Sequence, residues 1–482
     1  MKRLLAVVFL FLPFVSGAEG SLSRAPVVGI PQNGRVPILV RGIEEDRVRI
    51  SFREEGSQKI QSTDWSPLKK SADYSTTLWL EGIKAKTPHQ YRVEFGHSPP
   101  GEWISLKGFQ EEERPGKFRF VFSSCFREKF KPHHVFEAIQ KESPDFVALL
   151  GDSIYADSDG DLNKKKEREG SPLEAFRGKY QRNLDGHFQN LFRGIPVAAI
   201  WDDHDYGMNN GDRNYHFKVV SRSVFKETFP RYPFVEPQQG LYYQFRISDV
   251  DFFALDTRWY RSSIFEKDGG RKTMLGKRQL KWLLKALKES EEHGIPLKVI
   301  FSSVSWNDFG GDRPRDRPEA IDSWAGYKKE RQKILDFIKE NSIRGVLVLS
   351  GDQHWPSVDL IQGADQISPI SRSKNGAVYS LKDHSGTVFE VSASPLNTSQ
   401  SSRPPSVRPE EPLLESAVSL FRPPWWGDPP AQIPGHLKRT VSIYGLAEVD
   451  TTGLNKKVNV ILKEMDRVTQ RVAKLFEIEI RL

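Results

Sequence analysis

The chain has 482 residues, a formal net charge of +8 and a single cysteine, Cys125. The length predicts two or three domains, and the lone cysteine excludes an internal disulfide, so stability must come from apolar cores. The small positive excess suits anionic substrates or surfaces but does not identify one.

The first 18 residues are expected to be a secretory signal peptide. Lys2 and Arg3 form a short basic region, residues 4–15 are apolar, and residues 16–18 are small enough for cleavage. The apolar run is too short for a membrane span of about 20 residues, and no other segment is apolar enough to cross a membrane. We therefore expect a secreted or periplasmic protein without a transmembrane segment.

Residues 24–113 are expected to form a small β-sandwich. Short strands are predicted at 36–40, 47–52, 76–80 and 91–95, separated by polar and glycine-containing turns. The stretch 80–93 resembles the tyrosine corner of fibronectin type III domains, in which the tyrosine hydroxyl, here that of Tyr91, bonds back to the backbone of its own domain. We interpret this domain as supporting rather than catalytic.

From residue 114 to 482 strands alternate with helices, which predicts an α/β layered domain. Residues 401–437 hold nine of the 31 prolines and are expected to form an irregular loop. Helices are predicted at 133–142, 173–192, 277–289 and 326–340, and strands at 118–123, 146–150, 196–201, 241–247, 251–256, 298–303, 345–349, 387–392, 441–449 and 457–463.

Metal-type side chains follow four of these strands. A site on an α/β sheet lies outside the carboxyl ends of its strands, so we expect these side chains to converge. The four groups are Cys125 after strand 118–123, Asp152 and Tyr155 after 146–150, residues 202–205 after 196–201, and Asp352 and His354 after 345–349.

Asp152 is predicted to bridge two cations, because a carboxylate has two oxygens and Gly151 permits a sharp turn at the strand end. A thiolate from Cys125 and a phenolate from Tyr155 would favour a strongly Lewis-acidic metal such as iron. The alternative for Cys125 is a small buried apolar residue. A purely zinc-dependent site fits this set poorly, since zinc prefers His and Cys.

The run 201–210 is dense in oxygen and nitrogen ligands. A pair of aspartates alone would indicate a turn or a helix cap. A turn needs neither His204 nor the two asparagines, Asn209 and Asn210, and their presence indicates a functional site. Asp352 and His354 would alternate sides on an extended backbone and converge on a turned one.

Two further groups allow more than one role. Arg258 follows strand 251–256, and its guanidinium could bind phosphate oxygens bidentately or only pair with an Asp to hold the loop. His133 and His134 precede a predicted helix, where we expect surface or capping roles rather than ligation.

Six motifs, taken together and in this order, resemble the alkaline phosphatase D (PhoD) type of metallophosphoesterase. The wider superfamily begins with Asp-x-His where this chain has Cys125, and ends with Gly-His-x-His where this chain has residues 351–354; both departures match the PhoD branch. The motifs are residues 124–125, 151–155, 201–205 with 209–210, 255–261, 275–283 and 350–354.

The resemblance implies a four-layer α/β/β/α sandwich preceded by the small β domain, and a centre of Fe(3+) and Ca(2+). Cys125, Asp152, Tyr155 and His354 would hold the iron. Asp352 would hold calcium together with Asn210, for which Asn209 and Asp203 are alternatives.

The implied reaction is direct hydrolysis of a phosphoester by a metal-activated water, without a covalent phosphoenzyme. His204 and Arg258 are the expected catalytic residues, which stabilise charge on the phosphate oxygens. The substrate could be a small molecule, a wall polymer or a lipid head group, as a monoester or a diester, and no specific protein partner is predicted. The alternatives are a phospholipase- or nuclease-like phosphodiesterase and a catalytically inert secreted binding protein.

Overall fold

The computed structural model describes residues 22–110, 112–158, 171–308, 317, 320–363, 366–369, 377–380, 387–398 and 441–482. The expected signal peptide, 1–18, and the proline-rich loop, 401–437, lie outside the described residues. In the described part of the chain, no helix is both long and apolar enough to cross a membrane.

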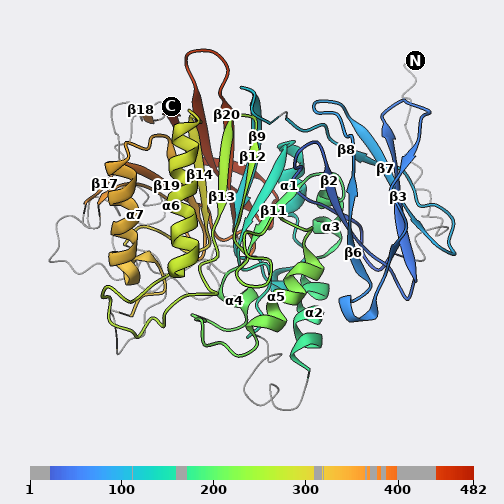
Figure 1. The fold of residues 1–482 in the computed structure, drawn as a ribbon, viewed down its shortest axis with the longest axis horizontal. Helices are drawn as coiled ribbons and strands as arrows, with labels where there is room; N and C mark the ends of the chain where they lie inside the picture. Colours follow the sequence, from blue (N-terminus) through green and yellow to red (C-terminus); the bar gives the residue numbers. More distant parts are fainter. Residues whose placement is uncertain are drawn as a thin grey trace, which may run out of the picture.

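Two small sheets at the N-terminal side share one core (Figure 1). Successive residues of a strand face opposite sides of its sheet, so one set of side chains points into this core. Side chains of that set, such as Ile38 and Ile50, are fully buried. The four strands predicted here coincide with β2, β3, β6 and β7. One sheet holds β1 (Val27–Val28), β2 (Val36–Arg41) and β6 (Ser75–Leu80), and the other β3 (Arg47–Glu54), β4 (Gln61–Ser62), β5 (Ser66–Pro67), β7 (His89–Phe95) and β8 (Ile104–Leu106).

The prediction for Tyr91 is wrong in its hydrogen-bond acceptor. The buried Tyr91 hydroxyl donates to the carbonyl oxygen of Arg193 at 2.6 Å, so it reaches across to the α/β region and not back to its own sheet. Arg41 likewise donates to the Glu227 carbonyl oxygen at 2.9 Å. These contacts fasten the small sheets to their neighbour, a role that local sequence pattern cannot distinguish from an internal corner.

The first large sheet joins segments that lie far apart in the chain. Its strands β9, β10 and β11 run parallel, and β20 pairs antiparallel with β9 and with β21, so the strands predicted at 441–449 and 457–463 extend this sheet. In spatial order it holds β11 (Val197–Ile200), β10 (Phe146–Leu150), β9 (Lys117–Ser123), β20 (Val441–Asp450), β21 (Lys457–Asp466), β22 (Val472–Arg481) and β18 (Ala377–Ser380).

The second large sheet has four neighbouring parallel strands, β13, β14, β15 and β19. Its edges are antiparallel, because β12 and β13 are consecutive strands joined by a tight turn, and β16 returns beside β19. In spatial order it holds β12 (Tyr243–Ile247), β13 (Val250–Ala254), β14 (Leu297–Ser302), β15 (Val346–Ser350), β19 (Val388–Ser392), β16 (Ser357–Gly363) and β17 (Gln366–Pro369).

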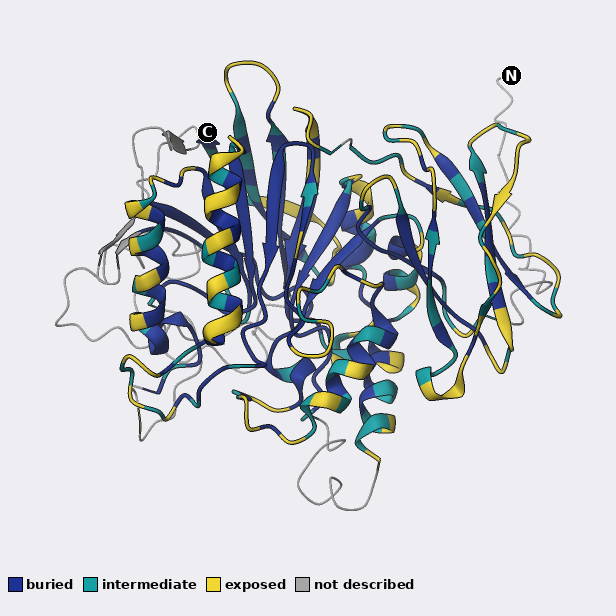
Figure 2. Cartoon of the chain, in the orientation of Figure 1, coloured by how far each residue is buried: buried dark blue, intermediate teal, exposed yellow. Residues whose placement is uncertain are grey.

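The two large sheets pack face to face through aromatic side chains. The Phe252 ring centroid lies 5.5 Å from that of Phe120 and 5.4 Å from that of Phe146, both of which belong to the first sheet. The next residue, Phe253, faces the opposite way into a core shared with Leu283 and Leu287. The inner strands, such as β10 and β11 of the first sheet and β14 and β15 of the second, are accordingly buried along their whole length (Figure 2).

Helices cover the outer faces, so the described elements form α/β/β/α layers (Figure 1) and confirm the α/β class. α6 and α7 lie on the second sheet, with one buried and one exposed stripe each (Figure 2), while α1, α2, α3 and α5 lie on the first. The helices are α1 (Val135–Lys141), α2 (Pro172–Asn183), α3 (Gly186–Phe192), α4 (Asp203–Tyr206), α5 (Lys218–Thr228), α6 (Gly276–Glu292) and α7 (Lys328–Glu340), with short 3-10 turns η1 (Lys70–Ala72), η2 (Glu128–Phe130) and η4 (Trp324–Tyr327).

The helix predicted over 173–192 is two helices. Leu184 leaves the helical region with ψ 78, and the Asp185 side chain accepts hydrogen bonds from the backbone N–H groups of His187 and Phe188. An aspartate in this position caps a new helix, because its oxygen satisfies N–H groups that lack a partner in the first turn. The aspartate and the glycine after it were the missed signal.

A buried acid on β16, Asp359, makes the free energy of unfolding depend on pH. Burial, followed by the charge of Glu390, raises the pKa of Asp359 from 3.8 to about 7. The folded protein therefore binds a proton that the unfolded chain has lost between these values, and the free energy of unfolding falls as pH rises through that window.

Asp359→Asn cannot ionise, but its side-chain oxygen can still accept hydrogen bonds from Asn307 and Ser357. Between pH 4 and 8, ionisation of Asp359 should lower the free energy of unfolding of the wild type by up to about 4 kcal/mol, and we expect this decrease to be absent from the variant. Denaturant unfolding at both pH values measures it. Asp64→Asn, at an exposed position, is the control. An unchanged pH dependence in Asp359→Asn would contradict the assignment.

Candidate metal centre

The four predicted clusters meet at the carboxyl ends of β9, β10 and β11 of the first sheet and of β15 of the second sheet. The loops there are held to one another by backbone hydrogen bonds. The N–H of Cys125 donates to the Gly151 carbonyl oxygen at 3.1 Å, and that of Phe126 donates to the Asp152 carbonyl oxygen at 3.1 Å. Cys125 and Asp152 therefore enter the same space.

The backbone of this edge is strained at the residues that carry the ligands. Five candidate ligand residues, named at the end of this paragraph, have a left-handed φ. This conformation is uncommon outside glycine and costs about 1–3 kcal/mol for each residue. Such strain persists only where surrounding contacts impose it, and it gathers at functional sites. The φ values are 65° at Cys125, 53° at Asp152, 58° at Asn210, 63° at Asp352 and 59° at His354.

Glycine before two of the ligands allows close approach of the loops. A Cβ on Gly151, which has φ 104°, would lie 2.6 Å from the Asp202 Cβ. A Cβ on Gly351 would lie 2.6 Å from the Ser124 Cβ. Either clash would push the strand-end loops apart, so both glycines are required by packing, and Gly151 is required by its positive φ as well.

Ligand-type atoms converge on Asp152. It belongs to three groups whose donor atoms lie within 4.8 Å of one another. This central place is what a bridging carboxylate requires. The groups are Cys125, Asp152 and His354; Asp152, Asp203 and His204; and Asp152, Asp202 and Asp352.

The last cluster turns rather than running on extended. The N–H of Gln353 donates to the Gly351 carbonyl oxygen at 2.8 Å, and Asp352 and His354 both take left-handed φ values. Of the two arrangements that the sequence left open, the structure has the converging one. The His354 Nε2 lies 3.1 Å from the Tyr155 hydroxyl, which brings Tyr155 to the same group.

Three buried oxygen atoms in this cluster accept no hydrogen bond from the described residues: Asp152 Oδ1, Asp202 Oδ2 and Asn210 Oδ1. A buried polar atom without a partner costs about 1–3 kcal/mol. Cations bound among these atoms would satisfy all three. The residues present therefore fit metal ions.

The electrostatics of the cluster also favour bound cations. Burial, and then the charge of Asp352, raises the pKa of the Cys125 thiol to about 12. Burial together with the neighbouring acidic groups raises the pKa of Asp152 and of Asp352 well above their usual range. Acids that are packed together and desolvated resist ionisation, whereas metal ions would favour their ionised forms.

The two asparagines differ in their placement. Asn210 is half-buried, donates its N–H to Asp203 Oδ2 at 2.8 Å and holds one of the three unpartnered oxygens. Asn209 is exposed and donates its N–H to Asp157 Oδ2 at 2.8 Å. The geometry favours Asn210 over Asn209 as a ligand, with Asp203 beside it.

His204 lies at the rim of the cluster. Its Nδ1 is 2.6 Å from Asp157 Oδ1, and its ring lies 4.2 Å from the Tyr155 ring, centroid to centroid. Burial opposes its charged form, but the charge of Asp203 and the hydrogen bond to Asp157 outweigh burial and raise its pKa to about 9. Asp157 therefore orients the imidazole and favours its protonated form.

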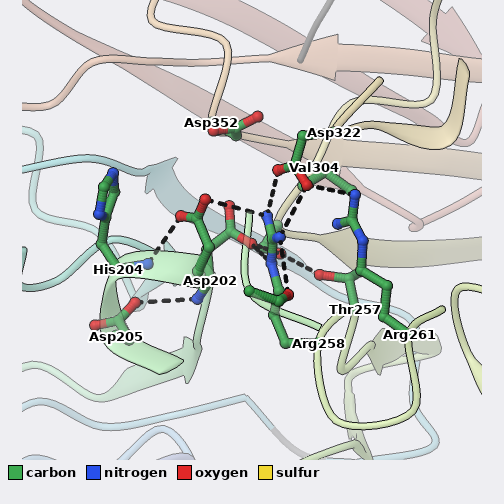
Figure 3. Close-up of polar contacts among 12 residues, drawn as sticks. Asp202, His204, Asp205, Thr257, Arg258, Arg261, Val304, Asp322 and Asp352 are labelled. Atoms are coloured by element: carbon green, nitrogen blue, oxygen red, sulfur yellow. Dashed lines mark hydrogen bonds and ion pairs between the residues drawn. The ribbon is translucent and has the colours of Figure 1, made fainter. Parts of the chain in front are cut away.

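Arg258 is fully buried between carboxylates (Figure 3). Its Nε donates to Asp202 Oδ1 at 2.6 Å, and its two terminal nitrogens donate to Asp322 at 2.9 and 3.1 Å. Arg261 donates to the same Asp322 carboxylate at 2.5 Å. Of the two roles left open for Arg258, these contacts favour the pairing role.

Three acidic residues that the sequence did not assign as ligands or supports prove important to the geometry. Asp202 faces Asp152 and Asp352, and Asp157 holds His204. Asp322 pairs with Arg258 from a loop that has no regular pattern to place it. Asp202 and Asp157 lie within or just beside predicted motifs, so their position was a usable signal, whereas Asp322 had none.

The comparisons agree with this geometry. The family model described as PhoD-like phosphatase matches residues 120–412. The curated alkaline phosphatase D of Bacillus subtilis (strain 168) is 26% identical over 389 residues, which cover 72% of this chain and 65% of that protein's length. The chain thus spans just under two thirds of this relative.

Two solved structures share the fold. The structure of PhoD aligns with a TM-score of 0.69 at 17% identity, covering 96% of this chain and 93% of that one. Purple acid phosphatase PPD1 from yellow lupin (Lupinus luteus) seeds aligns with a TM-score of 0.58 at 11% identity, covering 95% and 75%. Because the family model covers more than half of the chain and the motif order agrees with it, the chain belongs to the PhoD-like phosphatase family.

Proposed function

We propose that this protein is a secreted, metal-dependent phosphoester hydrolase that acts on phosphodiesters and phosphomonoesters. Membership of a phosphatase family supports the reaction class. The observation that carries the proposal is the convergence of three ligand groups on Asp152 together with three unpartnered buried oxygens. The basic, apolar and small residues of 1–18 support secretion.

We propose Fe(3+) beside Cys125, Asp152, Tyr155 and His354. Thiolate, carboxylate and phenolate would together carry three negative charges, which balance a trivalent ion. His354, within hydrogen-bond distance of the Tyr155 hydroxyl, adds a neutral nitrogen ligand.

Ca(2+) would lie beside Asp352 and Asn210, with Asp203, and less well Asn209, as alternatives. These residues offer the oxygen ligands that calcium prefers. Asp202, whose Oδ2 is buried and unpartnered, joins this set. Bound cations supply Lewis acidity and lower the pKa of water at the site.

The protein's own side chains then have separable tasks. His204, held through Nδ1 by Asp157, would present Nε2 to a phosphate oxygen and donate a proton or hydrogen bond there. Arg258 would act indirectly, because its nitrogens already bond Asp202 and Asp322. We therefore assign Arg258 to positioning the carboxylates.

Two other readings share part of this site. A phospholipase- or nuclease-like phosphodiesterase of the same superfamily would use the same centre with a different substrate. An inert binding protein would not need the ligand geometry, yet the strained backbone at five candidate ligands persists. The hydrolase is the function that the geometry supports best.

Nitrophenol release at alkaline pH tests the proposal. Protein loaded with iron and calcium should hydrolyse bis(4-nitrophenyl) phosphate and 4-nitrophenyl phosphate, a chelator should abolish turnover, and Cys125→Ala should lower it at least about 100-fold, since the thiolate helps to hold the metal. Thermal unfolding of the variant controls for folding. Absence of turnover by the loaded wild type on both esters and on phospholipid and nucleic-acid substrates would favour the binding protein. Full turnover by Cys125→Ala would exclude a thiolate ligand.

A further inference from the structure

A second group of metal-type side chains lies where α1 meets α3. His134 immediately precedes α1, Glu137 lies one turn further on, and His187 comes from the first turn of α3. One ring nitrogen of each histidine and one carboxylate oxygen of Glu137 lie within 4.8 Å of one another. None of these residues belongs to the candidate metal centre.

The contacts of the group leave one atom unsatisfied. His187 Nδ1 lies 2.8 Å from Glu137 Oε1, and His134 Nδ1 lies 3.8 Å from the same oxygen, beyond hydrogen-bond distance. The two imidazole rings lie edge to face, with 4.7 Å between their centroids and 60° between their planes. The His134 Nδ1 is buried and accepts or donates no hydrogen bond among the described residues.

The sequence predicted surface or capping roles for His134, and the structure does not support capping. The His134 side chain makes no cap hydrogen bond to α1. Its unpartnered nitrogen instead lies with the Glu137 carboxylate and the His187 imidazole. A polar atom in this condition costs free energy unless a ligand satisfies it.

We propose that His134, Glu137 and His187 form a zinc-type site that is separate from the catalytic centre. Two imidazoles and one carboxylate are a common protein ligand set for Zn(2+), with a fourth position left for water. Bonds of about 2.0–2.2 Å place tetrahedral ligand atoms about 3.3–3.6 Å apart. The two distances to Glu137 Oε1, 2.8 Å from His187 Nδ1 and 3.8 Å from His134 Nδ1, lie on either side of that spacing.

The position gives the site a consequence for the rest of the fold. The neighbouring His133 is buried, and its Nε2 lies 3.0 Å from Asn183 Oδ1. Asn183 in turn donates to the carbonyl oxygens of Phe126 and Ser153 at 2.8 and 2.7 Å, next to Cys125 and Asp152. A cation that joins α1 to α3 would therefore stabilise the hydrogen bonds that support the loops of Cys125 and Asp152.

Zinc binding measured by calorimetry and by dialysis tests the site. It is measured in an Asp152→Asn background, so that the catalytic centre contributes little. We expect the Asp152→Asn protein to bind one more Zn(2+) per chain than the double variants that also carry His187→Ala or Glu137→Gln. Zinc should also raise the unfolding temperature of the Asp152→Asn protein but not that of the double variants. Glu137→Gln keeps the side-chain shape and covers the case in which His187→Ala fails to fold.

The matched control is His97→Ala. His97 Nε2 lies 3.7 Å from Asp46 Oδ2 on an exposed surface, so it has a carboxylate neighbour but belongs to no three-residue group among the described residues. This control should lose no zinc. Cobalt in the proposed site should show d–d absorption without the thiolate charge-transfer band that Cys125 would produce.

Equal zinc stoichiometry in the Asp152→Asn protein with and without Glu137→Gln would overturn the site and leave a plain His187–Glu137 ion pair. Every readout here is binding, absorption or unfolding. A failure of the proposed hydrolase activity therefore leaves this test intact, and the reverse holds as well.

Discussion

Asp152→Asn should lower kcat/KM for bis(4-nitrophenyl) phosphate by about 1000-fold or more. An amide can offer only one neutral oxygen where the carboxylate offers two charged ones, so the variant loses the group on which all three ligand sets converge. Lewis-acid stabilisation is worth several kcal/mol, and each 1.36 kcal/mol is a factor of ten in rate. Steady-state kinetics and metal analysis of the purified variant measure both effects.

Asp251→Asn is the control for this change. Asp251 is also a mostly buried carboxylate at a strand, but it pairs with Arg246 at 2.6 Å, away from the candidate centre. It should keep wild-type metal content and activity. Normal metal content and turnover in Asp152→Asn would contradict the central role of this carboxylate.

Arg258→Met should destabilise the metal-free protein by about 3–5 kcal/mol, because it leaves Asp202 buried without its cation and Asp322 paired with Arg261 alone. The methionine fills similar space, so lost packing contributes little. Denaturant unfolding measures the change. Arg481→Met, which removes an Arg that is 61% exposed and pairs with Glu479 at 3.0 Å, should cost less than about 1 kcal/mol.

The same variant separates the two roles of Arg258. If its guanidinium bound substrate phosphate, Arg258→Met would raise KM or lower kcat with little loss of stability. If it positions Asp202, as its contacts favour, stability and metal affinity should fall together, and Arg258→Lys should rescue only part of either. A lysine cannot reproduce the forked contacts to two carboxylates.

The position of the candidate centre could be predicted because it depends on local pattern. Buried strands end at Ser123, Leu150, Ile200 and Ser350, and a ligand-type residue follows each within a few positions. Parallel strands that end at one edge bring such residues together without any knowledge of the loops. Cys125, Asp152, Asp352 and His354 were predicted in this way.

The support for that centre could not be predicted. Asp322 approaches Arg258 over 64 residues of chain, and the Tyr91 hydroxyl finds Arg193 over 102. Such partners have no sequence spacing of their own, because side chains meet wherever packing of distant elements brings them. The same limit explains why the role of Arg258 stayed open until its neighbours were known.

The α/β class, the strand-end chemistry and the family resemblance follow from the amino-acid sequence, since each depends on residue types and short-range order. The three-dimensional fold was needed to choose between alternatives that share one local pattern. It turned Asp352 and His354 inward, favoured Asn210 over Asn209, and brought His134, Glu137 and His187 together from two helices. The reason is physical, because a ligand site is defined by distances between side chains and those distances are set by the packing of elements far apart in the chain.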